Sequence, residues 1–204
     1  MSDRAIATLP PHTLSAACVL VGRAFAADPF ARHAIPDAQG REERLAHLYR
    51  PLMAATLRYG HVEVTSKSFT GLAGWLPPGN EIVGTIQQIR CGGLGVPFRV
   101  PWGILRRYLD YGSYANALHR KLVSEPHWYL AVLAVGPEHQ GQEQGSELLR
   151  AGLLRVDAES RPCYLETQNP RNIALYERHG FEVVEQTRVP STPIDHWCML
   201  RPAS

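Results

Sequence analysis

The chain has 204 residues, a mass of 22.7 kDa and a formal net charge of +2. So small a charge gives no electrostatic reason to expect a nucleic acid or an anionic membrane as a partner. Apolar residues make up 45% of the sequence, which is enough to build a sizeable core. We therefore expect a single domain over residues 1–204 that binds neither nucleic acid nor membrane.

The cysteines and histidines give no sign of a metal site. No CxxC or HExxH pattern occurs, and the closest histidines, His119 and His127, are eight residues apart. The N-terminus has no apolar segment typical of a signal peptide, and no apolar run reaches membrane-spanning length. We expect a cytoplasmic protein with no metal and with reduced cysteines: Cys18, Cys91, Cys163 and Cys198.

Two helices are predicted in the first 60 residues. In residues 12–30 apolar residues recur at helical spacing, and the segment ends near Pro29. Residues 41–60 repeat this pattern and end at a glycine. Pro51 lies inside the second segment, so we expect a kink or a division of the helix there.

The middle of the chain predicts a hairpin and a long helix. Residues 61–66 and 69–80 are short extended runs, the second closed by a Pro-Pro-Gly turn, and they predict an antiparallel hairpin. A connector rich in glycine and proline follows over residues 91–101. Residues 104–122 then predict an amphipathic helix, with four basic residues expected on its solvent side: Arg106, Arg107, Arg120 and Lys121.

The last third of the chain alternates strands and helices. Residues 127–135 form a nearly continuous apolar run, which predicts a strand buried on both faces. A helix is predicted over residues 169–180, with Asn169 as its N-cap and Gly180 as its C-cap. Two adjacent strand–helix units flanked by antiparallel strands predict a mixed α/β sheet. Its other strands are expected over residues 162–167, 181–189 and 195–202.

The stretch PEHQGQEQGSELL, residues 137–149, looks like an anion-binding loop that leads into a helix. The free N–H groups and the dipole at a helix start favour an anion such as a diphosphate. Gly141 and Gly145 suit a backbone that approaches a ligand closely, and Ser146 offers a hydroxyl. The spacing excludes a Walker loop and a dinucleotide fingerprint. On its own, the pattern also fits an ordinary strand–helix turn.

Several ordered motifs resemble one family. The stretches LAVGPEHQGQEQGSELL, YLET and NPRNIALYERHGF resemble the GCN5-related N-acetyltransferase (GNAT) superfamily, and within it the puromycin N-acetyltransferase type. The likeness is strong over residues 126–202 and looser in the N-terminal helices. It implies an α/β fold with a mixed, mostly antiparallel sheet, a central splayed pair of parallel strands and flanking helices. It also implies acceptor-side helices and a hairpin over residues 1–125, and an acetyl-CoA-binding core over residues 126–204.

The resemblance further implies a site for acetyl-CoA as cosubstrate. The backbone of Leu133, Ala134 and Val135 would hydrogen-bond the pantetheine arm of the cofactor. Asn172 would contact it near the sulfur, and Tyr176 would protonate the departing CoA thiolate. The diphosphate would lie on the backbone N–H groups of the loop, which consists of Gln140, Gly141, Gln142, Glu143, Gln144, Gly145 and Ser146.

Some of these side chains also have structural interpretations. Glu166 is our candidate for the base that takes a proton from the amine, but a pairing with Arg171 or Arg178 would make it purely structural. Tyr176 lies on an apolar helix face, where a tyrosine is usually a core residue. Trp75 belongs either to the wall of the acceptor pocket or to the core of the hairpin, and we favour the core.

The loop departs from the family pattern at two positions. Glu143 stands where the family has its middle glycine, and Gln144 replaces a residue that is usually aliphatic. A non-glycine residue at positive φ is strained by roughly 1 kcal/mol. A carboxylate near a diphosphate adds repulsion of about 1 kcal/mol in a water-like dielectric. Together these two effects predict cofactor binding that is weakened by about ten- to a hundredfold.

The sequence therefore leaves more than one function open. The first is an acetyl-CoA-dependent N-acetyltransferase in which a small-molecule amine attacks the thioester directly. The alternative is a binding or sensing module with a degenerate cofactor site, which Glu143 and Gln144 favour. An acyltransferase that uses a different acyl-CoA differs only in the size of its pocket. Both a monomer and a homodimer are compatible with the sequence.

Overall fold

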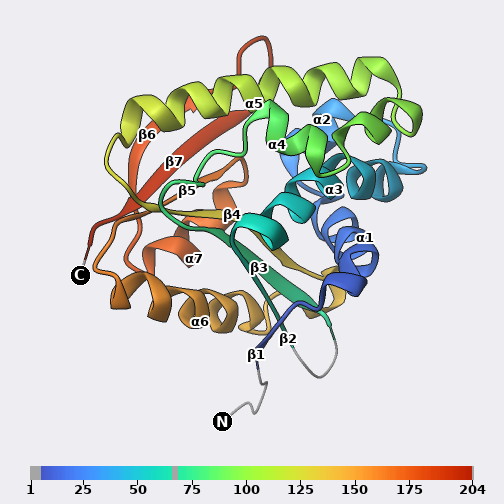
Figure 1. Ribbon diagram of the computed structural model, residues 1–204. Coiled ribbons are helices and arrows are strands. Elements are labelled where there is room, and N and C mark those ends of the chain that lie inside the picture. Colours follow the sequence, from blue (N-terminus) through green and yellow to red (C-terminus); the bar gives the residue numbers. More distant parts are fainter. Residues whose placement is uncertain (1–5, 66–68, 204) are drawn as a thin grey trace.

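The computed structural model describes residues 6–65 and 69–203, which fold around one seven-stranded sheet (Figure 1). The strands lie in the order β1-β2-β3-β4-β5-β7-β6. Their bounds are β1 Ile6–Thr8, β2 His61–Thr65, β3 Gly71–Leu76, β4 Trp128–Val135, β5 Cys163–Thr167, β6 Glu182–Arg188 and β7 Asp195–Arg201.

Seven α-helices and four short 3-10 helices surround this sheet within the described residues. The α-helices are α1 Leu14–Phe25, α2 Pro29–Ala34, α3 Arg41–Tyr59, α4 Thr85–Arg90, α5 Trp102–Leu122, α6 Gln144–Ala158 and α7 Ile173–Glu177. The 3-10 helices are η1 Pro11–Thr13, η2 Gly93–Phe98, η3 Pro137–His139 and η4 Pro170–Asn172. In the part of the chain that is described, no helix combines the length and the apolar character that a bilayer crossing requires.

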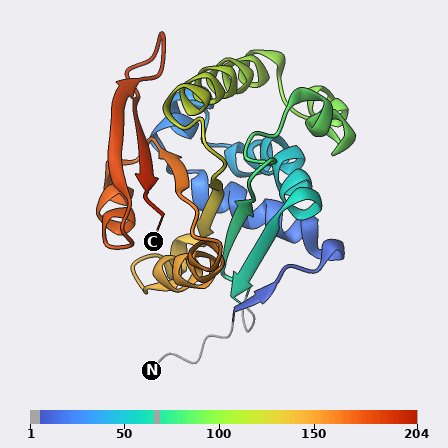
Figure 2. The ribbon, with the colours of Figure 1, turned by 60° about the vertical axis from the view of Figure 1, so that its left-hand side comes forward.

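The centre of the sheet is held together by very little strand pairing. All neighbouring strands are antiparallel except β4 and β5, which pair only at Trp128–Cys163 and Tyr129–Tyr164. Beyond these two pairs the strands separate, and Figure 2 shows the β6–β7 hairpin on one side and β2 and β3 on the other. The structure thus confirms the expected mixed sheet with a central splayed parallel pair.

Strand β4 changes the faces of its side chains halfway along. Its register with β3 skips Ala131, which is therefore a β-bulge. Before the bulge, Leu130 belongs to the core cluster beneath α6; after it, Val132 belongs to the cluster beneath α1 and α3. The prediction of a strand buried on both faces was wrong for every second residue. Tyr129, Ala131, Leu133 and Val135 are only half-buried.

Helix α6 packs very closely against β3. A Cβ atom placed on Gly152 would lie 2.1 Å from the ring of Trp75, so only glycine fits between the helix and this ring. Trp75 is fully buried and belongs to the core cluster that also contains Leu149 and Phe181. The expectation that Trp75 is a core residue is confirmed.

Helices α1 and α3 cover the other face of the sheet and touch each other through backbone. A Cβ atom on Gly22 would lie 2.2 Å from the carbonyl oxygen of Glu42. Helix α3 runs unbroken from Arg41 to Tyr59 with Pro51 inside it, so the predicted division of the helix at Pro51 does not occur. Pro51 is buried, and tertiary packing outweighs the loss of one backbone hydrogen bond.

Two segments differ from the sequence prediction. The connector predicted over residues 91–101 contains the 3-10 helix η2, and the short helix α4 precedes it. Strand β1 was not predicted either, because three residues are too few for a periodic pattern. The hairpin of β2 and β3 and the long helix α5 are confirmed, although Ser66 of the predicted hairpin lies outside the described residues.

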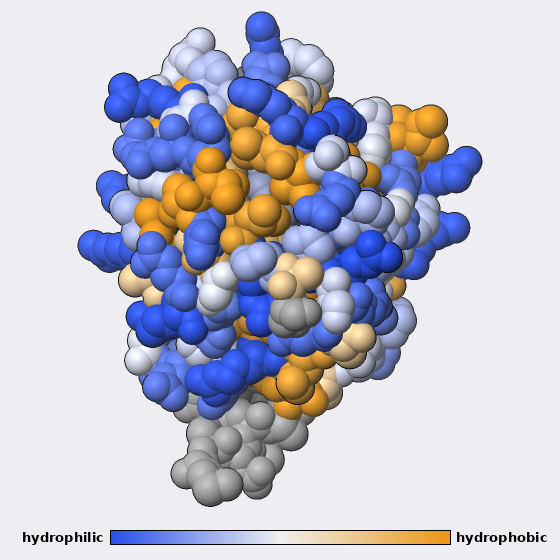
Figure 3. Space-filling model, turned by 90° about the vertical axis from the view of Figure 1, so that its left-hand side faces the viewer, coloured by the Kyte–Doolittle hydropathy of each residue, from blue (hydrophilic) through white to orange (hydrophobic). Residues whose placement is uncertain are grey.

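The strand β6 forms an edge of the sheet. It lies at the left in Figure 1, and Figure 3 shows this side of the molecule, where apolar side chains gather and polar ones border them. Val183 and Val184 of β6 are both exposed. An edge strand has one row of backbone N–H and C=O groups without a strand partner, whereas the backbone groups of an inner strand are paired on both sides.

The C-terminal end of α5 is anchored by a pair of buried histidines. The Nε2 atoms of His119 and His127 are 2.6 Å apart, and Nδ1 of His127 is 2.6 Å from the carbonyl oxygen of Glu125. The ring of His119 also stacks on Tyr164 of β5, with a centroid distance of 4.2 Å. These contacts tie α5 to the two strands at the point where they still pair.

Replacement of Gly152 tests the close packing of α6. We expect Gly152→Ala to lower the free energy of unfolding by about 1–3 kcal/mol, because the new methyl group overlaps the Trp75 ring. Urea denaturation measures this change. Gly103→Ala in α5 is the control, since a Cβ atom there meets nothing within 4 Å. Equal stability of the two variants would contradict the packing described here.

Candidate active site

A cavity lies where β4 and β5 separate. It has a volume of about 310 Å³ and is lined by β4 from Leu130 to Leu133 and by Glu166 and Thr167 at the end of β5. Asn172 and Tyr176, which follow β5 in the chain, also line it. The structure therefore brings together one of the three predicted strand residues, Leu133, with Glu166, Asn172 and Tyr176.

The edge of β4 that faces β5 is open beyond Tyr129. Leu133, Ala134 and Val135 pair with β3, at Ala73, Leu72 and Gly71. On the other side, none of these three residues pairs with β5. A strand edge without a partner presents N–H and C=O groups to a ligand, and an extended arm that contains amide groups is complementary to it. This geometry fits the pantetheine arm implied by the family resemblance.

The loop after β4 has the conformation of a helix N-terminus with two left-handed residues. Gly141 has φ 75°, and Glu143, the N-cap of α6, has φ 62° and ψ 0°. Position 143 thus requires the conformation that glycine adopts most easily, and Glu143 is strained there. The Glu143 side chain is exposed, so the carboxylate is free to extend into solvent.

The rest of the loop is braced by side-chain hydrogen bonds. Gln140 Nε2 donates to the carbonyl oxygen of Val135 at 3.1 Å, and Gln142 Nε2 donates to that of Glu138 at 3.0 Å. Gln144 is buried, and its Oε1 accepts a hydrogen bond from the Thr70 hydroxyl at 2.8 Å. The buried side chain of Gln144 therefore has a hydrogen-bond partner beneath the loop. Ser146 is buried in the first turn of α6, and Gly145 lies against Leu133, Val135 and Leu175.

Glu166 is a carboxyl group held by tyrosines. The hydroxyl of Tyr164 donates to its Oε1 at 3.0 Å, and the hydroxyl of Tyr129 also hydrogen-bonds it. Burial raises the pKa of Glu166 to about 7, although these hydrogen bonds lower it. Within the described chain, Glu166 forms no ion pair with Arg171 or Arg178. The structure therefore does not show the ion pair that would have made Glu166 purely structural.

Tyr176 is a core residue that also reaches the cavity. It is buried, and its ring meets Phe181 edge-on at a centroid distance of 6.0 Å. Burial raises the pKa of its hydroxyl above the ordinary value, and the charge of Asp28 adds to this effect. The hydroxyl therefore keeps its proton at neutral pH. Asn172 lies one turn earlier, and its Nδ2 donates weakly to the Thr167 hydroxyl at 3.4 Å.

The cavity also has an aromatic wall that the sequence analysis did not identify. This aromatic wall consists of Phe25 of α1, Phe30 of α2, Tyr49 of α3, and Tyr108 and Tyr111 of α5. Its rings are in contact, with centroid distances of 4.4 Å for Phe30–Tyr111, 5.2 Å for Phe30–Tyr108 and 5.1 Å for Phe25–Tyr49. The available signal was the pair Tyr108 and Tyr111 within the predicted amphipathic helix over residues 104–122, but helical spacing alone does not show that they line a cavity.

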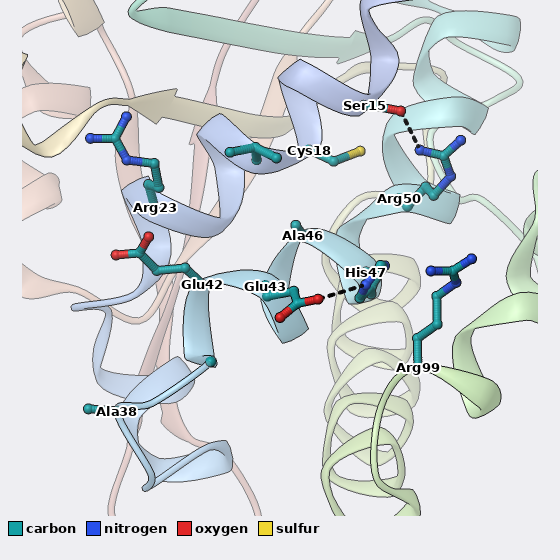
Figure 4. A pocket seen from close by; sticks show the side chains of 12 residues that line it. Ser15, Cys18, Arg23, Ala38, Glu42, Glu43, Ala46, His47, Arg50 and Arg99 are labelled. Carbon is teal, nitrogen blue, oxygen red and sulfur yellow. Dashed lines mark hydrogen bonds and ion pairs between the residues drawn. The ribbon is translucent and has the colours of Figure 1, made fainter.

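A second, larger hollow lies outside this region. This groove between α1 and α3 has a volume of about 790 Å³. Figure 4 shows Arg23, Glu43, His47 and Arg50 among the side chains that line it. Its charges are mixed, and Arg50 donates to the Ser15 hydroxyl at 3.1 Å. None of the predicted site residues lines this groove. In the described residues, no group of three or more His, Cys, Asp or Glu side chains is arranged to hold a metal ion.

Comparison with known proteins agrees with this architecture. A model of the Acetyltransferase (GNAT) family matches residues 62–181. An N-acetyltransferase of Schizosaccharomyces pombe, described as uncharacterized, is 26% identical over 117 residues, which are 55% of this chain and 47% of that protein. The mycothiol acetyltransferase of Propionibacterium freudenreichii subsp. shermanii is 32% identical over 104 residues, which are 47% of this chain and 33% of that protein.

A solved structure shares the fold over almost the whole chain. It is described as histone acetyltransferase HPA2 and related acetyltransferase from Corynebacterium glutamicum, and it is 22% identical with a TM-score of 0.63. The alignment covers 98% of this chain and 96% of that one. By contrast, the chain spans half or less of the length of the two curated relatives. Because the family model covers more than half of its residues, the chain belongs to the Acetyltransferase (GNAT) family.

The strain at Glu143 can be measured directly. We expect Glu143→Gly to raise the free energy of unfolding by roughly 0.5–1 kcal/mol, because glycine adopts positive φ without a steric cost. Glu143→Gln removes the charge and keeps the strain, so it should unfold like the unmodified protein. Denaturation curves in which Glu143→Gly gains no stability over Glu143→Gln would show that the backbone here is relaxed.

Proposed function

We propose that this protein is an acetyl-CoA-dependent N-acetyltransferase whose acceptor is a small-molecule amine. One observation carries the proposal: a single cavity touches the open edge of β4, a carboxyl group with a pKa near 7 and a protonated tyrosine hydroxyl. Membership of the Acetyltransferase (GNAT) family supports the same chemistry. The proposal includes the likeness to the puromycin N-acetyltransferase type, which rests on the motifs over residues 126–202.

Acetyl-CoA would be held by the second half of the chain. The backbone of Leu133, Ala134 and Val135 would bind the pantetheine arm, and Asn172 would contact the cofactor near its sulfur. The loop Gln140–Ser146 at the start of α6 would bind the diphosphate through backbone N–H groups. We propose that residues 126–204 are the cofactor-binding core and that residues 1–125 supply the acceptor side of one domain. The aromatic wall, which comes from α1, α2, α3 and α5, supports this division.

Two side chains would move protons during the reaction. Bound acetyl-CoA supplies an acetyl group on a thioester, whose carbonyl carbon is open to direct attack by an amine. Glu166 would accept the proton that the amine nitrogen loses, and a pKa near 7 suits this task at neutral pH. Tyr176 would donate its hydroxyl proton to the departing sulfur. The raised pKa of Tyr176 keeps that proton available. The cavity walls would align the two reactants.

The alternative of a binding or sensing module rests on Glu143. The structure offers a compensation for each departure in the loop: the Glu143 side chain is exposed, and Gln144 is hydrogen-bonded to Thr70. The strain at position 143 would then weaken cofactor binding without closing the site. For this reason we favour the acetyltransferase over the module.

Titration of acetyl-CoA into the protein by calorimetry is the first test. We expect micromolar binding by the unmodified protein, binding that is about tenfold tighter for Glu143→Gly, and release of CoA when primary amines are added. Tyr176→Phe should bind acetyl-CoA normally and release CoA much more slowly. If only Glu143→Gly binds, the site exists but Glu143 closes it. No binding by either protein would refute the proposal.

The base can be identified from the pH dependence of the reaction. Because the pKa of Glu166 is raised to about 7, the carboxylate is mostly protonated at pH 6 and cannot accept a proton there. We expect kcat/KM for a fixed amine to rise through about pH 7. Glu166→Gln should lower kcat/KM by roughly a hundredfold and remove this inflection. Glu182→Gln, at an exposed site on β6, is the control. An inflection that survives in Glu166→Gln would assign the base elsewhere.

A further inference from the structure

The charged side chains that line the cavity are all acidic. Asp28, Glu81 and Glu166 line it, and among the described residues no lysine, arginine or histidine does so. A carboxylate that is removed from bulk water is costly unless a cation or hydrogen-bond donors compensate for the loss. An anionic acceptor would add to this negative charge, and a neutral one would leave it uncompensated. A cationic acceptor would neutralise it.

Asp28 lies on a different element from the proposed base. It is the N-cap of α2, and its Oδ1 accepts a hydrogen bond from the backbone N–H of Phe30 at 3.0 Å. Burial raises the pKa of the Asp28 carboxyl despite its hydrogen bonds to the backbone of Phe30 and Ala31. The carboxyl group thus lines the cavity in surroundings that stabilise its charge poorly.

The two carboxyl groups act on the same part of the cavity. Burial raises the pKa of Tyr111, and the charges of Glu166 and Asp28 both raise it further. Contacts place Tyr111 between the two groups. Its ring centroid lies 4.4 Å from that of Phe30, whose backbone N–H donates to Asp28, and its hydroxyl accepts a hydrogen bond at 2.6 Å from Gln168, two residues after Glu166. An acceptor that lies along Tyr111 would therefore extend from the start of α2 towards the end of β5.

The aromatic wall connects these two ends. Phe30 contacts both Tyr108 and Tyr111, and Tyr49 lies 6.4 Å from Tyr108 between ring centroids. Aromatic faces bind apolar bodies and attract cations, most strongly where water is excluded. The wall therefore suits a flat apolar body that joins two positively charged groups.

We propose that the acceptor is a diamine in which an aromatic ring joins two alkylamine groups. The first amine is acetylated beside Glu166 and Tyr176, and the second stays protonated and pairs with Asp28. This inference rests on the proposed function and names its class of substrate. Asp28 then determines specificity and takes no part in the transfer of the acetyl group. A monoamine of the same size would fill the cavity but leave Asp28 without its cation.

One substitution separates this role from the structural role of Asp28. Asparagine is as good an N-cap as aspartate, so Asp28→Asn keeps the start of α2 and removes only the charge. Asp37→Asn is the matched control, because Asp37 Oδ1 accepts from the backbone N–H of Gln39 at 2.9 Å in the same i,i+2 arrangement but does not line the cavity. Thermal melts verify that both variants fold.

The test compares two ligands that differ by one amine. The probes are p-xylylenediamine and p-methylbenzylamine, titrated by calorimetry at pH 7, where all their amino groups are protonated. We expect the unmodified protein and Asp37→Asn to bind the diamine about tenfold more tightly than the monoamine, and Asp28→Asn to show about twofold preference or less. This readout is binding, so it does not depend on turnover.

The outcomes distinguish this inference from the proposed function. Equal affinity for the two probes in the unmodified protein, no binding of either at millimolar concentration, or a preference that survives in Asp28→Asn would each overturn the inference. Titration of acetyl-CoA into the same samples tests the proposed function separately. A preference for the diamine that depends on Asp28, in a protein that does not bind acetyl-CoA, would support the diamine as the ligand of the cavity and refute the proposed acetyltransferase activity.

Discussion

The separation of β4 and β5 is the constraint on which the rest of the structure depends. Only the Trp128–Cys163 and Tyr129–Tyr164 pairs join the two strands, and the β-bulge at Ala131 follows directly in β4. A parallel pair that ends so early leaves backbone groups exposed at the middle of a sheet, where they are normally satisfied. The helices around the sheet then enclose the gap, so that an interruption of regular structure becomes a cavity.

Burial produces the chemical character of this cavity. The carboxyl groups of Glu166 and Asp28 and the hydroxyls of Tyr111 and Tyr176 all have raised pKa values, and burial is the largest cause in each case. The same loss of water makes a carboxyl group a better proton acceptor at neutral pH and keeps a phenol protonated. Hydrogen bonds from tyrosines keep the pKa of Glu166 near 7 and prevent a larger rise.

Local signals were readable from the sequence, and contacts between distant elements were not. Asn169 accepts a hydrogen bond from the backbone of Arg171, so the predicted N-cap of the segment over residues 169–180 is confirmed, although a 3-10 helix precedes α7. The predicted C-cap was wrong: α7 ends at Glu177 with Arg178 as its C-cap, and Gly180, with φ 83°, lies two residues further on. The position of Glu166 at the end of its strand was also predictable. The aromatic wall was not, because its rings come from four helices that meet only in the folded chain. Nor was α4, which has only six residues and buries none of them.

The histidine pair at the end of α5 makes the fold sensitive to acid. Burial lowers the pKa of His119 to about 3, and the neighbouring His127 contributes to this shift. In the unfolded chain a histidine has a pKa near ~6.5, so below that pH the unfolded state binds more protons than the folded one. Stability therefore falls as the pH drops from about 6.5 towards 3, and it is fully retained above 6.5. Acid would release α5 from β4 and β5, and with it the side of the cavity that carries Tyr108 and Tyr111.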